Sequence, residues 1–190
     1  GMMSAKPVEW NEILLKRLEE HDTTVEHVWK TDGIIFAYPL YTDSMPGIVV
    51  RFLETLQERA DSLADNKNRR IPVVFLVHSG FPEGIHTMHL PAIHSRICEQ
   101  FGFQYMGTIR KPGSEGVRLM PPKMLHSLFT VLQNAGSTLV TGEPLDDKAL
   151  NSLVRHERFG LTGRLLMNIA SGLGLTSIYF KRMLKKHNAW

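Results

Sequence analysis

Apolar positions along the chain form short continuous runs as well as sets at helical spacing. Ile34 to Tyr38 and Val73 to Val77 are continuous runs in which no polar position alternates with the apolar ones. Such runs are typical of strands that are covered on both faces, as in a parallel sheet. A third extended segment follows at Tyr105 to Ile109. The three segments predict a parallel sheet of about three strands.

Apolar residues at helical spacing predict a helix after each of these strands. The chain therefore repeats a strand, a loop and a helix, which favours right-handed crossovers and a three-layer, doubly wound α/β fold. The apolar residues that mark these helices are Val49, Phe52, Leu53 and Leu56 in the first, Leu90, Ile93, Ile97 and Phe101 in the second, and Leu125, Leu128, Phe129 and Leu132 in the third.

Two further helices are predicted before the first strand. Trp10 to Leu18 has apolar residues at helical spacing among charged ones, which indicates an amphipathic helix. Thr23 followed three places later by Glu26 has the form of a capping box, so a short helix from Thr24 to Lys30 is expected next.

The pattern changes from Glu143 onward, where no further strand is indicated and two or three short helices are expected. We therefore predict an α/β core over residues 1–142 and a helical extension of the same domain over residues 143–190.

Composition narrows the class of protein. The chain has 190 residues and a mass of 21.6 kDa, which fits one domain, and 43% hydrophobic with 22% charged residues is ordinary globular usage. The net charge of +3 is too small to indicate a nucleic-acid partner. Cys98 is the only cysteine, so an intrachain disulfide is impossible and a reducing cytoplasm is the natural location.

The chain shows no targeting or spanning segment by sequence. Glu9, Asn11 and Glu12 stand where the apolar core of a signal peptide would be needed. The most apolar stretch, Leu165 to Phe180, is interrupted by polar residues and is shorter than a membrane span of about 20 residues. We expect a cytoplasmic protein with no membrane span.

No metal or catalytic motif stands out. His86 and His89 have helical spacing, but no nearby carboxylate or thiolate completes a set of ligands, so no metal is expected. Cys98 lies beside the apolar face of a predicted helix with no evident base, which favours a buried thiol over a nucleophile. Hydrolase and nucleoside triphosphatase motifs are missing from the sequence.

The loops after the first two strands carry the informative residues, because ligands of open parallel sheets bind at the carboxyl ends of the strands. Pro39 to Gly47 combines prolines, hydroxyls, a carboxylate and Tyr41 before a helix. His78 to Gly84 offers glycines for close backbone approach, Phe81 as an apolar wall and Glu83 as an acceptor. A rigid connection and a packed turn remain the plain alternatives for these two loops.

The same loops carry a resemblance to a known family. The stretch Asp32 to Tyr41, continuing through Ser44 to Gly47, resembles the third-strand segment of flavodoxin-like NAD(P)H-dependent FMN reductases. Ser79 to Glu83, followed by a helix and Phe103 to Gly107, is similar to the next strand and loop of that family. The resemblance covers about Asp32 to Leu132 and implies a flavodoxin-like fold.

The resemblance also implies FMN as cofactor and NAD(P)H as electron donor. In the family, the first loop packs along the flavin ring and ribityl chain, and the second borders the pyrimidine edge of the ring. No protein acid or base is implied for hydride transfer, so no catalytic residue is predicted. The implied cofactor-binding residues are Pro39, Leu40, Tyr41, Thr42, Asp43, Ser44, Ser79, Gly80, Phe81 and Glu83.

The sequence departs from the family before Trp10, where neither the family's first strand nor its phosphate-binding loop is recognisable. The sheet is therefore expected to lack its first two strands, which makes Ile34 to Tyr38 an edge strand. Soluble proteins normally cover or pair such an edge. C-terminal helices, a separate polypeptide or a second copy could do so, and we favour a homodimer that pairs through this strand.

Two functions follow from these features. The first is an FMN-dependent NAD(P)H oxidoreductase that passes electrons to a small acceptor. The second is a degenerate flavodoxin-like scaffold without cofactor, acting as an interaction or assembly module. The ring-contacting loops favour the enzyme, and the lack of a phosphate loop favours the scaffold.

Overall fold

The structure is a computed structural model of the chain, which divides into two compact units, residues 1–155 and 156–190. The candidate site and both sheet edges belong to the first unit. Of the helices expected from Glu143 onward, those beyond residue 154 lie mostly outside the described residues, and the predicted division at residues 142 and 143 stays a prediction. The structure describes residues 9–17, 21–41, 44–60, 70–81, 83–154, 165, 168–169, 171–174, 177 and 181.

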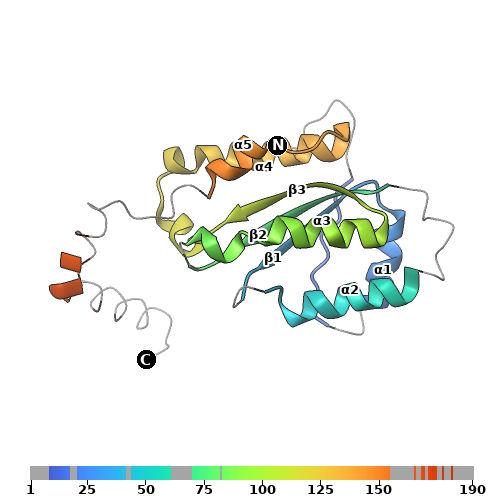
Figure 1. Ribbon diagram of the computed structural model, residues 1–190, viewed down its shortest axis with the longest axis horizontal. Helices are drawn as coiled ribbons and strands as arrows, with labels where there is room; N and C mark the ends of the chain where they lie inside the picture. Colours follow the sequence, from blue (N-terminus) through green and yellow to red (C-terminus); the bar gives the residue numbers. More distant parts are fainter. Residues whose placement is uncertain are drawn as a thin grey trace. The chain divides into compact units, whose positions relative to one another are not determined.

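A parallel sheet of three strands forms the middle of the first unit (Figure 1). Its strands are β1 (Ile34–Pro39), β2 (Pro72–His78) and β3 (Gln104–Lys111), in the order β1-β2-β3. The register pairs Ile34 with Val73 in β1 and β2, and Pro72 with Gln104 in β2 and β3. The predicted number and direction of strands are confirmed.

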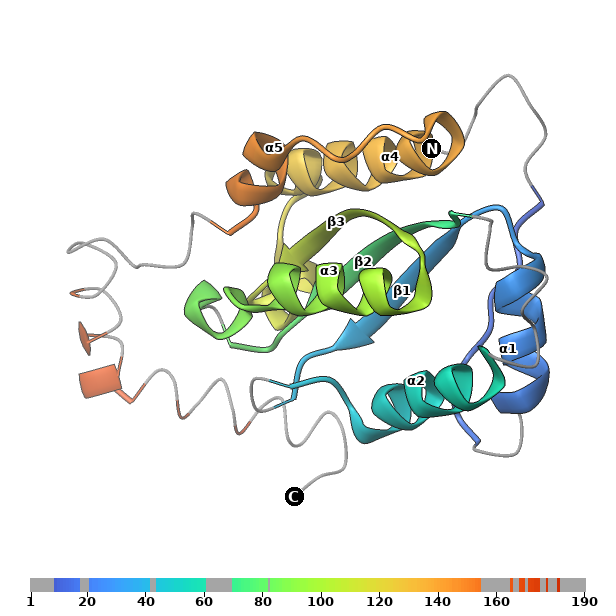
Figure 2. The same ribbon diagram turned by 45° about the vertical axis from the view of Figure 1, so that its right-hand side comes forward.

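Helices cover both faces of this sheet. The helices α1 (His21–Lys30), α2 (Gly47–Ala60) and α3 (Leu90–Phe101) share one hydrophobic cluster with the sheet. The helices α4 (His126–Thr141) and α5 (Asp147–Ser152) share a second cluster, and Figure 2 shows them together on one side of the sheet. The predicted three-layer α/β architecture is confirmed. Short 3₁₀ helices lie at Gly84–Thr87 (η3), Ser114–Leu119 (η4) and Pro122–Leu125 (η5).

The central strand explains why its sequence reads as a continuous apolar run. Val73, Phe75 and Val77 belong to the first cluster, whereas Val74 belongs to the second. Because successive strand side chains point to opposite faces, a strand between two helical layers needs apolar residues at nearly every position.

The amphipathic helix predicted from Trp10 is wrong over the residues that the structure describes. Residues 9–17 carry no helix, and Trp10, Ile13 and Leu14 are exposed, while Leu15 packs on the first cluster. A helix of this length is marginal in water unless a neighbour buries its apolar face. Trp10, Ile13 and Leu14 are not buried by a neighbour among the described residues, so the pattern alone does not produce a helix.

The second predicted helix is confirmed as α1, but it begins at His21, three residues before the predicted start. Thr23 therefore lies inside the helix and is not its cap. His21 is buried, with its ring edge-on to Phe52 at 5.4 Å between centroids. This side chain therefore packs the first turn of α1 against α2.

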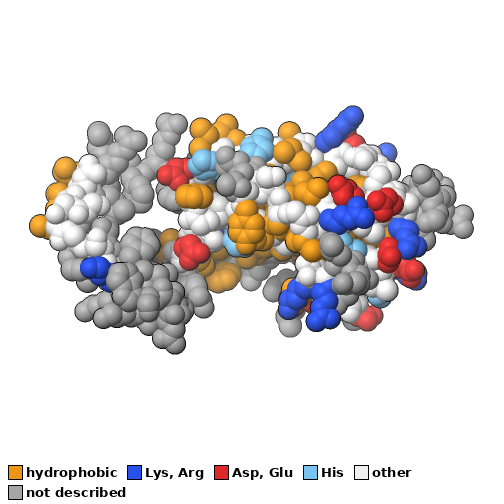
Figure 3. All heavy atoms as spheres, turned by 90° about the horizontal axis from the view of Figure 1, so that it is seen from below, with side chains coloured by type: hydrophobic (Ala, Val, Ile, Leu, Met, Phe, Trp, Pro, Cys, Tyr) orange, Lys and Arg blue, Asp and Glu red, His pale blue; other side chains and the backbone are white. Residues whose placement is uncertain are grey.

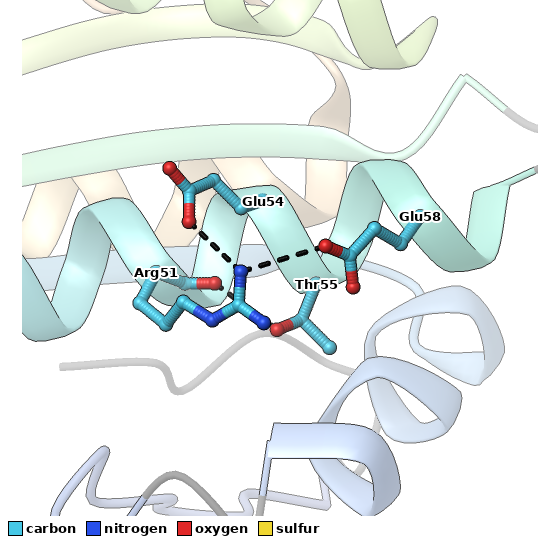
Figure 4. A network of polar contacts seen from close by, with 4 residues as sticks. All are labelled: Arg51, Glu54, Thr55 and Glu58. Carbon is cyan, nitrogen blue, oxygen red and sulfur yellow. Dashed lines mark hydrogen bonds and ion pairs between the residues drawn. The ribbon is translucent and has the colours of Figure 1, made fainter.

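A network of charged side chains lies on the solvent face of α2 (Figure 4). Arg51 Nη1 lies 3.0 Å from Glu54 Oε2 and 3.4 Å from Glu58 Oε1. All three side chains are about half exposed, and such ion pairs on a helix each contribute only about 0.3–0.5 kcal/mol to stability.

Among the described residues, no helix is long and apolar enough to span a membrane.

Candidate functional site

The three strands end at one edge of the sheet, where backbone hydrogen bonds join the loops that follow them. The Leu40 N–H donates to the His78 carbonyl at 2.8 Å, which ties the first loop to the second. The Ser79 N–H donates to the Lys111 carbonyl at 3.2 Å, which ties the second loop to the third. The two predicted ligand loops therefore lie side by side.

The first loop combines a fixed backbone with one open aromatic side chain. Tyr41 and Ser44 exchange backbone hydrogen bonds of 3.1 and 3.0 Å, and the Pro46 carbonyl accepts from the first turn of α2. Leu40 is buried, whereas Tyr41 is 63% exposed. Pro39 is partly buried at the end of β1. Thr42 and Asp43, both predicted to contact the ribityl chain, lie outside the described residues.

Hydrogen bonds of the buried Ser79 hold the second loop in place. Ser79 is 2% exposed, and its hydroxyl donates to the Phe81 carbonyl at 3.0 Å. The Ser79 carbonyl accepts from both the N–H and the hydroxyl of Ser114, at 2.9 and 3.0 Å. The Gly113 N–H donates to the Phe81 carbonyl at 2.8 Å. These bonds hold the Phe81 backbone between two loops.

Phe81 itself points its ring outward. The side chain is 65% exposed, and its ring centroid lies 5.9 Å from that of His86. Ile85 and Met88 nearby in sequence are exposed to the same extent. Within the first unit, Figure 3 shows apolar and histidine side chains together on the side toward which the strands run in Figure 1. Charged side chains gather toward the opposite side in that view.

The other two predicted residues of this loop are open. Gly80 and Glu83 are both exposed. A Cβ placed on Gly80 would meet only the Glu115 side chain, at 3.7 Å, so the fold itself does not require a glycine there. This leaves close backbone approach of a ligand as the predicted reason for Gly80.

The basic residues at the end of β3 are engaged within the protein. Arg110 Nη1 donates to the Thr87 carbonyl at 3.5 Å and its Nη2 to Asn151 Oδ1 at 3.1 Å. Lys111 Nζ donates to the Pro112 carbonyl at 2.7 Å. Arg110 thus links the segment before α3 with α5, across the end of the sheet.

Behind the loops lies a buried polar cluster that the sequence reasoning missed. His94 of α3 hydrogen-bonds through Nε2 to the Tyr38 hydroxyl, and through Nδ1 to Thr108 Oγ1 at 2.8 Å. The Tyr105 hydroxyl bonds the same Thr108 oxygen at 2.8 Å. Since Tyr38 lies two residues before Leu40, the cluster fixes the strand end from which the first loop departs.

Burial sets the ionisation of this cluster. Desolvation, aided by the charge of His89, lowers the pKa of His94 to about 3, and desolvation raises the pKa of Tyr38. Both groups are neutral at physiological pH. The burial of His94 could have been predicted from its position on α3. It lies four residues after the buried Leu90 and four before Cys98, on the face that packs on the sheet.

The described part of the chain shows neither a metal-binding cluster nor a reactive thiol. No group of three His, Cys, Asp or Glu side chains there could hold a metal ion. Cys98 is buried as predicted, and desolvation, with the nearby Glu99 charge, raises the pKa of its thiol to about 12. A thiol of that kind is protonated and inert.

The site therefore offers two open aromatic rings on loops that are fixed from behind. Pro39, Leu40, Tyr41 and Ser44 come together on the first loop, and Ser79, Gly80, Phe81 and Glu83 on the second. An exposed aromatic face at a strand end suits a planar, mostly apolar ligand.

Comparison with known proteins yields distant structural likeness. No family model and no curated protein matches the sequence. Solved structures similar to it include the Trp repressor binding protein from Bacillus subtilis, at 20% identity and a TM-score of 0.46, covering 50% of this chain and 64% of that one. An NADPH-quinone reductase from P. pentosaceus is 13% identical with a TM-score of 0.49, covering 67% and 79%. An NADH:FMN oxidoreductase in its apo form is 15% identical with a TM-score of 0.41, covering 76% and 64%.

Proposed function

We propose that the protein is an FMN-dependent NAD(P)H oxidoreductase that passes electrons to a small acceptor in the cytoplasm. The observation that carries the proposal is the pair of exposed aromatic side chains, Tyr41 and Phe81, on adjacent loops at the carboxyl ends of parallel strands. The resemblance of these two loops to those of FMN reductases assigns them the flavin ring.

The residues present fit the ring of a flavin. Tyr41 and Phe81 would pack on the isoalloxazine, with Pro39 and Leu40 fixing the backbone beneath. Gly80 and Glu83 would border its polar edge beside the buried Ser79. Thr42, Asp43 and Ser44 would follow the ribityl chain. A bound flavin supplies the hydride and electron chemistry, so the protein's part is to bind and orient the ring and to limit its contact with water.

Among the described residues of these loops, no group of side chains forms a binding site for the phosphate of FMN. Arg110 and Lys111 donate to carbonyl and amide oxygens of the protein itself. Binding would therefore depend mainly on the ring, which places the affinity in the contacts of Tyr41 and Phe81.

The test is a titration of the purified chain with FMN, followed by quenching of flavin fluorescence. We expect saturable binding in the micromolar range that is weakened at least tenfold in Tyr41→Ala and in Phe81→Ala. Phe129→Ala is the control, because Phe129 is a half-exposed aromatic residue on α4 and belongs to neither loop. Absence of binding by a folded chain at millimolar FMN would exclude the proposal.

The open edge of the sheet favours a second candidate function. β1 pairs with β2 alone among the described strands, so a strand from another polypeptide can extend the sheet there. A flavodoxin-like scaffold without cofactor, used for assembly, would have this edge as its functional feature. In either function the working form we propose is a homodimer.

A further inference from the structure

The two edges of the sheet are built differently. Along β3, the Leu145 N–H donates to the Met106 carbonyl at 2.8 Å. Gln104 Nε2 donates to the Gly142 carbonyl at 3.2 Å. The segment between α4 and α5 thus lies along the outer side of β3 and satisfies part of its backbone.

β3 also carries an irregularity that disfavours pairing on its outer side. Val73 of β2 pairs with Tyr105, but Val74 pairs with Gly107, so Met106 is an extra residue in β3. Gly107 has a φ of +136°, and a Cβ placed there would lie 3.1 Å from Leu145 Cβ. A bulge and a covering segment are both means by which proteins prevent further strand pairing.

In the part of the chain that the structure describes, β1 shows neither feature. It runs in regular register with β2 from Ile34 to Pro39, with no shift in the pairing. Ile34, Ile35 and Phe36 are only half buried, whereas Val73, Val74 and Phe75 opposite them are buried. Five uncharged residues before Pro39 form a regular, mostly apolar edge, of the kind that pairs with another strand.

We propose that this edge pairs with β1 of a second copy of the chain, antiparallel about a two-fold axis, so that the two three-stranded sheets form one of six strands. The strand has no charge, so two copies meet without repulsion. Among the described residues only the β1 edge is open, because β3 is covered, and pairing through a single open edge closes at two copies instead of growing into a fibre.

The inference specifies the homodimer proposed above and does not rest on flavin binding. Antiparallel pairing directs the carboxyl ends of the two sheets away from each other. The loops with Tyr41 and Phe81 therefore lie at opposite ends of the joined sheet, and each candidate site belongs to one chain. Dimerisation then stabilises β1, from which the first loop departs.

The test uses charge at Ala37, the exposed residue of β1. We expect the wild-type chain to have twice its monomer mass of 21.6 kDa by sedimentation without flavin, and Ala37→Lys to reduce this to the monomer. Ala37→Glu should do the same, and mixing the two variants should restore a dimer containing one of each. Val140→Lys, at an exposed apolar site on α4, is the matched control and should remain dimeric.

Hydrogen exchange of the wild-type chain provides a second measurement that needs no variant. Those amides of residues 34–38 that point away from β2 should become at least tenfold more protected as concentration rises through the dimerisation range, whereas those of β3 should not change. A monomer at all concentrations, a dimer that Ala37→Lys leaves intact, an open-ended polymer, or a different polypeptide co-purifying on the edge would each overturn the proposal. Flavin titration is scored separately, so failure of either proposal is distinguishable from failure of the other.

Discussion

The imidazole of His94 lies flat against the ring of Phe75, with 3.8 Å between ring centroids and 6° between ring planes. Phe75 is in the middle of β2, and His94 is on α3. The stack places a titratable ring at the centre of an apolar layer, where its two nitrogens are satisfied by Tyr38 and Thr108. The sheet and α3 therefore share one buried side chain that must stay neutral.

This arrangement predicts that the chain loses stability in mild acid. His94 is protonated at about pH 6.5 in the unfolded chain, but only at about pH 3 in the folded one. Between these values the unfolded state binds more protons, so the free energy of unfolding falls as pH falls, by at most about 1.4 kcal/mol per pH unit from this group. Urea unfolding at pH 7, 6 and 5 measures the slope.

Comparison with His94→Gln isolates the contribution of this residue. Glutamine keeps hydrogen-bonding capacity but does not titrate, so the variant should be less stable at pH 7 and should show a shallower dependence between pH 7 and 5. An unchanged slope would mean that other groups dominate the acid response.

Removal of the hydroxyl that faces His94 should also be measurable at neutral pH. Tyr38→Phe leaves the buried Nε2 of His94 without its partner, which typically costs about 1–3 kcal/mol. Tyr41→Phe, three residues further along the chain, removes a hydroxyl from an exposed ring and should change stability by less than about 0.5 kcal/mol. Equal effects of the two changes on the urea midpoint would contradict the buried network.

Gly107 is predicted to be required by the bulge of β3. Gly107→Ala combines a φ of +136° with a contact of 3.1 Å to Leu145 Cβ, so we expect a loss of about 2–4 kcal/mol. Gly142→Ala is the matched control, because Gly142 also has a positive φ, +75°, but nothing lies within 4 Å of its added Cβ. Thermal unfolding of both variants separates backbone strain from the clash with Leu145, and similar losses would show that the clash is unimportant.

The strands were predictable because their signal is local and strong. A residue such as Val74 is apolar whichever face it occupies, and the continuous run around it follows from two covering layers. The helix predicted at Trp10 failed for the opposite reason, since its stability depends on a neighbour that periodicity does not reveal. Gly102, by contrast, ends α3 with a φ of +69°, the left-handed conformation that glycine commonly adopts at the end of a helix.

The sequence predicts where the residues of the candidate site lie, but not which hydrogen bonds they form. Tyr41 and Phe81 lie on neighbouring loops because parallel strands end at one edge, which follows from the strand assignment alone. The Ser79 hydroxyl donates to the Phe81 carbonyl, and the Ser79 carbonyl accepts from Ser114, whose approach is set by tertiary packing. For the same reason the joint burial of Tyr38, His94 and Thr108 could not be read from residues 56 and 14 positions apart.

The proposed flavin site makes a prediction about its own selectivity. If the aromatic rings of Tyr41 and Phe81 provide the affinity and the phosphate has no binding site, the dissociation constants of riboflavin and FMN should differ by no more than about threefold. A phosphate held by three charge-assisted hydrogen bonds, at about 1.5–3 kcal/mol each, would instead favour FMN by several powers of ten. Parallel titrations at low and high salt measure both ligands, and the FMN affinity should change little with salt. A preference for FMN above 100-fold that disappears in Lys111→Gln would show that this lysine leaves the Pro112 carbonyl to bind the phosphate, and the ring-only account would then be wrong.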